Sequence, residues 1–176
     1  MSNLRLIDQT TVLSGVSSVS VPNVFTSDFD VYKIVGANFV GATSTGTGTN
    51  MRLIGTDGVG IVVDYRYASV DMKGEASFGE GESEDTNRFW NAFAGIDDGD
   101  QGAGGVVYVF NPANTDRYTF IIYESVGGYS DNFRAFKGVG SYKKTVPITG
   151  FIIENNELVN FDGGGMIKTY GLRVDS

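Results

Sequence analysis

The chain contains no cysteine and no histidine, and only 3 of its 176 residues are proline. Without cysteine it forms no disulfide, no thiolate metal site and no thiolate nucleophile. Without histidine it lacks the most common general base and the most common transition-metal ligand. Serine–histidine triads and HExxH metalloprotease sites are therefore excluded.

Basic residues are also few: 13 lysines and arginines stand against 21 acids, for a net charge of −8. This balance argues against a protein that tracks nucleic-acid phosphates or binds an anionic membrane. The adjacent basic pair, Lys143 and Lys144, is too small for a nucleic-acid footprint. No apolar run reaches the ~18 residues that span a bilayer, and residues 1–15 show no secretory signal.

The acidity is local. Residues 75–100 hold eight acids and a single base, Arg88, whereas the rest of the chain holds 13 acids and 12 bases. A β-rich body close to neutrality therefore carries one acidic segment, and the question is what that segment faces.

What the chain has in quantity favours strands. Valine and isoleucine number 31 against 6 leucines, with 12 phenylalanines, 9 tyrosines and 25 glycines. Side chains branched at Cβ and aromatic rings suit pleated surfaces, and scattered glycines suit tight turns. Residues 31–40 predict a core strand. We therefore expect one all-β domain over residues 1–176, a jelly-roll-type sandwich of about 8–10 antiparallel strands.

Residues 71–105 are the least strand-like part, and we interpret them as an acidic, glycine-rich insertion with a short helix. Ser83 is a candidate N-cap, and Phe89 and Phe93 would share one helix face. Gly95 would end the helix.

Two segments are candidates for protein contacts. The polar loop at residues 43–49 has nothing to bury and supplies Thr43, Thr45 and Thr47. Within residues 61–70, apolar and polar residues alternate, which places Asp64 and Arg66 on a face that is wet or lies between subunits.

A weak cation motif follows the predicted helix. Asp98 and Asp100 alternate with glycine as in a calcium loop, but the expected bidentate glutamate is absent, so a solvated acidic loop is the alternative. Trp90 with Asp97, Asp98 and Asp100 is a candidate glycan site, since sugars bind on an aromatic face beside carboxylates. Helical spacing would instead bury the neighbouring rings.

The candidate catalytic residues are four acids, Glu80, Glu82, Glu84 and Asp85. A glycosidase needs two acids on opposite sides of a sugar cleft, whereas these acids are interspersed with glycine and serine as in a solvated segment. The glycine clusters at 102–105 and 163–165 do not match a phosphate-binding loop. We therefore expect no enzyme activity and no cofactor.

Three segments in order carry a family resemblance: Val24-Phe25-Thr26-Ser27-Asp28-Phe29-Asp30-Val31-Tyr32-Lys33-Ile34-Val35; Val107-Tyr108-Val109-Phe110-Asn111-Pro112 with Thr115; and Ile148-Thr149-Gly150-Phe151 through Gly165-Met166-Ile167-Lys168-Thr169-Tyr170-Gly171-Leu172. Together they resemble the β-sandwich virion structural and tail-fibre-associated proteins of tailed bacteriophages, especially marine and cyanobacterial ones. This chain departs from that pattern at residues 71–105.

The resemblance implies a non-enzymatic virion protein, made in the bacterial cytoplasm, that decorates or cements the capsid or tail. It implies contacts with other virion proteins and a homo-oligomer, with a trimer expected, and no nucleic-acid or membrane partner. A receptor-binding, lectin-like tail-fibre module that recognises a host glycan is the alternative.

Overall fold

Almost every regular element of the chain is a strand. The computed structural model describes residues 3–43, 47–75, 77–97, 102–129, 132–156 and 159–173. The strands in these residues are β1 (Leu4–Thr11), β2 (Ser18–Val21), β3 (Val31–Phe39), β4 (Thr47–Ile54), β5 (Tyr65–Lys73), β6 (Ser77–Thr86), β7 (Gly95–Ile96), β8 (Ala103–Phe110), β9 (Thr119–Tyr129), β10 (Asn132–Tyr142), β11 (Gly150–Asn155) and β12 (Met166–Leu172).

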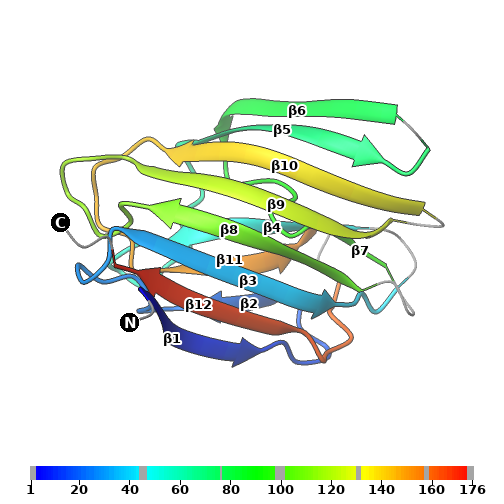
Figure 1. Cartoon of the computed structure of the whole chain (residues 1–176), viewed down its shortest axis with the longest axis horizontal. Coiled ribbons are helices and arrows are strands. Elements are labelled where there is room, and N and C mark those ends of the chain that lie inside the picture. Colours follow the sequence, from blue (N-terminus) through cyan, green and yellow to red (C-terminus); the bar gives the residue numbers. More distant parts are fainter. Residues whose placement is uncertain are drawn as a thin grey trace.

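The strands form two antiparallel sheets. The large sheet has the order β1-β12-β3-β8-β9-β10-β5-β6, and the small sheet has the order β2-β11-β4-β7. Figure 1 shows the large sheet with β6 at one edge and β1 at the other, and the small sheet behind it.

The connectivity is that of a jelly roll with two added hairpins. When the hairpins β5-β6 and β9-β10 are set aside, successive strands alternate between the two sheets except β4 and β7, which are neighbours in the small sheet. This gives the four-strand sets β1-β12-β3-β8 and β2-β11-β4-β7. The all-β jelly-roll-type sandwich expected from the composition is confirmed. The two hairpins pair with one another and widen the large sheet beyond β8.

The core lies between the sheets and follows from strand alternation. In β3, Tyr32 and Ile34 are fully buried, while Lys33 between them points the other way. Phe151 and Ile153 of β11 are buried from the opposite side. The ring of Phe25 packs edge-on against Tyr32 with centroids 4.8 Å apart. The apolar faces of both sheets are therefore buried against each other.

The prediction of a short helix within residues 71–105 is wrong. Residues 77–86 form β6, which pairs with β5 from Met72↔Phe78 to Ala68↔Glu82. The reason is the two-residue period of this segment, which sends its glutamates to one side of the strand and Gly79 and Gly81 to the other. Charged side chains suit an exposed edge strand because they oppose pairing with other chains.

Residues 87–97 continue into the core. Met51 and Phe89 exchange backbone hydrogen bonds of 3.0 and 2.9 Å, so this segment runs along β4. Asn91 and Ala94 have positive φ angles of 53° and 62°, which interrupt a helix. Phe89 and Phe93 are buried, as the helical interpretation also expected, but turns place them there.

Within the described ranges no helix is long and apolar enough to cross a membrane.

Candidate functional site

The most distinctive surface is the side of the large sheet that faces away from the small sheet, here called the outer face. Because the strands are in register, its side chains lie in rows that cross the sheet from β6 towards β1. The first row contains Arg66, Ser141, Phe120, Phe110, Val31, Leu172 and Leu4, and the second contains Glu82, Ala68, Val139, Ile122, Tyr108, Lys33, Tyr170 and Leu6. The third row contains Glu80, Val70, Lys137, Glu124, Val106, Val35, Lys168 and Gln9. The fourth row contains Phe78, Met72, Ala135, Val126 and Gly104.

The centre of the outer face is apolar and open to solvent. Phe120 and Ile122 of β9 are 47% and 42% exposed, and Val139 of β10 is 53% exposed. Val70 of β5 and Val126 of β9 extend the same patch. These residues occupy the middle of long strands, where side chains are held in place by the ladder, and contiguous exposed patches of this kind mark interaction surfaces.

The outer face is uneven. A hollow of about 500 Å³ lies beside Ala68 and Ser141, bordered by Phe110, Phe120 and Arg66. A second hollow of about 600 Å³ runs along Val70, Glu80 and Lys137, and a third of about 620 Å³ reaches Val106 and Val126. The outer face thus has protruding side chains and hollows, and the hollows can accept side chains from another surface.

Charge divides the outer face into two ends. Glu80, Glu82 and Glu84 project from β6 at one end, and Lys33 of β3 and Lys168 of β12 project at the other. Lys33 has its amine 5.9 Å from the centroid of the Tyr108 ring. In the middle, the Lys137 amine lies 2.6 Å from the Glu124 carboxylate. An apolar centre is therefore flanked by acids on one side and lysines on the other.

The contact residues predicted from the sequence are scattered. Arg66 lies on the outer face, where its guanidinium donates to the Glu84 carbonyl oxygen at 3.3 Å. Asp64 precedes β5 and forms an ion pair of 3.4 Å with Lys144. Thr47 is buried and donates its hydroxyl hydrogen to the Asn156 carbonyl oxygen at 3.1 Å. Thr43 is exposed at a bend, and Thr45 lies outside the described residues.

The sequence did contain a signal for the outer face. In β9, Phe120 and Ile122 alternate with Ile121 and Tyr123, so both sides of the strand are apolar. Such a run is typical of a strand buried on both sides. Here Ile121 and Tyr123 are buried, whereas Phe120 and Ile122 face water in the single chain. The signal is therefore the second apolar side of the strand, formed by Phe120 and Ile122, which stays exposed in the single chain.

The predicted glycan residues have other neighbours. The Trp90 indole donates to the Thr86 hydroxyl at 3.1 Å, and the Arg88 guanidinium lies 5.2 Å from the Trp90 ring centroid. Asp97 is buried, and its carbonyl oxygen accepts from Gly41 N–H at 2.9 Å. Asp98 and Asp100 lie outside the described residues. The glycan and calcium hypotheses stay predictions.

The acids considered for catalysis stand in line along β6. Glu80, Glu82 and Glu84 are exposed neighbours on one side of an edge strand. A hydrogen bond from the Lys143 amine holds the pKa of Asp85 below its usual value, the direction that suits an ion pair and not a general acid. In the part of the chain that the structure describes, no three carboxylates gather closely enough to hold a metal ion.

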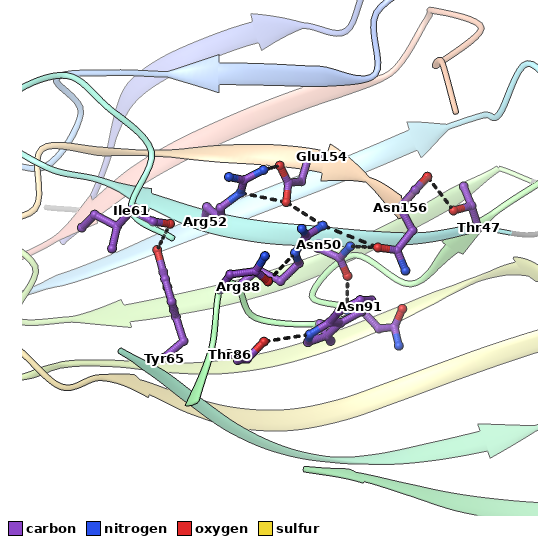
Figure 2. Close-up of polar contacts among 12 residues, drawn as sticks. Thr47, Asn50, Arg52, Ile61, Tyr65, Thr86, Arg88, Asn91, Glu154 and Asn156 are labelled. Atoms are coloured by element: carbon purple, nitrogen blue, oxygen red, sulfur yellow. Dashed lines mark hydrogen bonds and ion pairs between the residues drawn. The ribbon is translucent and has the colours of Figure 1, made fainter. Parts of the chain in front are cut away.

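A buried charged cluster, which the sequence did not indicate, joins β4, β11 and the segment after β6 (Figure 2). The Glu154 carboxylate accepts from Arg52 Nε at 2.8 Å and also from Arg52 Nη2, and it lies 2.9 Å from Arg88 Nη1. Asn50 and Asn156 continue the cluster with a 3.1 Å side-chain hydrogen bond. Its members satisfy one another, so this cluster stabilises the fold and leaves no open site.

Comparison with known proteins yields little. No protein-family model and no curated protein matches the chain. Among solved structures, the chain is similar to a structure of the infectious bursal disease virus Gx strain, with 11% sequence identity and a TM-score of 0.19. That match covers 98% of this chain and 40% of the other. A likeness this weak carries no argument about function.

Proposed function

We propose that this protein is a non-enzymatic structural protein of a bacteriophage virion, which assembles with itself and with other virion proteins on the capsid or tail. The observation that carries the proposal is the outer face, where apolar side chains at the centres of β5, β9 and β10 are exposed in the single chain. Interfaces between proteins have such apolar centres with charged rims.

Burial of this patch would supply a large driving force. Covering one valine, isoleucine or phenylalanine side chain contributes about 1.5–3 kcal/mol. Phe120, Ile122 and Val139 are about half exposed, so covering all three represents about 2–4 kcal/mol, part of which offsets the entropy lost on association.

The virion setting is supported by the three ordered segments that resemble phage virion proteins. The jelly roll is compatible with it, since this fold builds many viral shells, although the fold also occurs in lectins and cupins.

The proposal is tested by locating the protein and by changing the outer face. In particles of the phage that encodes this chain, labelled antibody should decorate the capsid or tail surface. Purified protein added to particles that lack it should bind, and Val139→Lys should abolish binding. Val59→Lys, at a loop valine that is 61% exposed, is the matched control and should bind normally. Absence of the protein from particles would overturn the virion assignment, and normal binding of Val139→Lys would overturn the role of the outer face.

A further inference from the structure

We propose that the outer face is covered by a second copy of this chain, related by a twofold axis that runs parallel to the strands between β9 and β10. This inference rests on the proposed self-assembly and names its surface and symmetry. It follows from how charge, size and area are distributed across the rows of the outer face.

Under this symmetry an acid from one end of the outer face meets a lysine from the other end. A twofold axis between β9 and β10 exchanges β10 with β9, β5 with β8, and β6 with β3, because these pairs are equally distant from it. Glu82 of β6 and Lys33 of β3 belong to the same row. Each copy's Glu82 therefore comes over its partner's Lys33, and symmetry forms the contact twice.

The charges in the middle are also matched. Lys137 and Glu124 face each other across β10 and β9 in one row, on either side of the axis. Rotation brings the Lys137 of one copy over the Glu124 of the other. Four charges of alternating sign then surround the axis, and no like charges are brought together there.

Side-chain size is complementary along the same rows. The exchange of β5 with β8 sets Ala68 opposite Tyr108, and the exchange of β10 with β9 sets Ser141 opposite Phe120. Ala68 and Ser141 line the hollow of about 500 Å³, so rings from the second copy have space to enter it. Small residues facing large ones allow two sheets to interdigitate.

The available area is sufficient for a stable pair. Six strands at about 4.8 Å spacing and four rows of side chains span roughly 800 Å² per copy, or roughly 1,600 Å² in total, the size of a standard specific interface. Pairing through the β6 edges is the competing arrangement. It would place Glu80, Glu82 and Glu84 of each copy beside the same acids of the other, which like charges disfavour.

The test uses charge reversal at the two predicted partners. Sedimentation velocity of the wild-type chain should show a dimer. Glu82→Lys and Lys33→Glu should each raise the dimer dissociation constant at least tenfold. An equimolar mixture of the two variants should restore the dimer, because each variant supplies the charge that the other needs at both contacts. Asp57→Lys, a similar reversal at an exposed position of the loop that follows β4 of the small sheet, should leave the dissociation constant unchanged.

Each outcome decides a different point. A wild-type trimer overturns the twofold pair but leaves self-assembly intact. Mixing the two variants also distinguishes a dimer from a trimer. In a ring of three copies, at least one junction between positions 82 and 33 would join like charges, so the mixture could not restore a trimer. A dimer that is unaffected by both reversals, or not restored by mixing, overturns this geometry. A wild-type chain that stays monomeric at high micromolar concentration overturns the self-assembly that both proposals share. Circular dichroism of each variant verifies that it is folded.

Discussion

The ring of Phe89 lies directly against Gly140 of β10. A Cβ atom at position 140 would come within 2.5 Å of the Phe89 ring, closer than two carbon atoms can approach. Phe89 is fully buried and is also paired with Met51 of β4, so the ring has little freedom to move away. The segment after β6 is thus fitted between the two sheets.

Gly140→Ala should therefore destabilise the fold by about 1–3 kcal/mol, the usual cost of overpacking a core. Chemical denaturation followed by Trp90 fluorescence measures the free energy of unfolding. Ser141→Ala changes the next residue, which points to the outer face, and should alter stability little. Equal stabilities of the two variants would show that residues 87–94 do not pack as described.

The Arg52–Glu154–Arg88 cluster should contribute more than any surface ion pair. Glu154→Ala leaves two guanidinium groups facing each other in a largely buried place, and we expect a loss of about 3 kcal/mol, since removal of one partner from a buried pair is strongly destabilising. Urea denaturation checks this. Lys144→Gln breaks an exposed pair and should cost less than about 1 kcal/mol. Similar costs would contradict the buried character of the cluster.

Alkaline pH should destabilise the fold through its buried tyrosines. Burial raises the pKa of Tyr123 to about 12 and also raises the pKa of Tyr65. The folded state therefore prefers the neutral phenols, and their contribution to stability is complete below pH 10 and is lost as pH rises towards 12. Thermal unfolding midpoints between pH 8 and pH 11.5 measure the decline.

Tyr123→Phe should make that alkaline decline shallower, because one group that must ionise on unfolding has been removed. At neutral pH it should cost a little stability, since the Tyr123 hydroxyl donates to the Trp90 carbonyl oxygen at 3.1 Å. Tyr118→Phe, at an exposed ring, is the control and should leave the pH profile unchanged. A Tyr123→Phe profile that matches the wild type would contradict the assignment.

The parts of the fold that sequence could predict are those with a local signal. The core strand β3 follows from Tyr32 and Ile34 alternating with Lys33, and the jelly-roll class follows from composition. The strand β6 was missed because glutamate and glycine both have low β-propensity, while pairing with β5 and the exposed edge decide its conformation.

Long-range contacts had no such signal. Arg52 and Glu154 meet although they lie 102 positions apart in the sequence, and nothing near either residue indicates the other. The outer face had a signal that does not distinguish two cases, because an apolar run such as Phe120–Tyr123 has the same appearance whether one side or both sides are buried in the chain. A strand buried on one side is distinguished from a strand buried on both sides only by the position of the small sheet, which leaves Phe120 and Ile122 exposed.

The most direct test of the central claim, that the outer face is an assembly surface, is the solution mass of the wild-type chain and of Val139→Lys. Sedimentation velocity at micromolar concentration should give an oligomer for the wild type and a folded monomer of about 19 kDa for the variant. The variant should stay folded, because Val139 is exposed in the single chain, and it should lose only the concentration-dependent part of the thermal stability that the oligomer adds. A monomeric wild type, or an oligomer that survives Val139→Lys, would contradict the account.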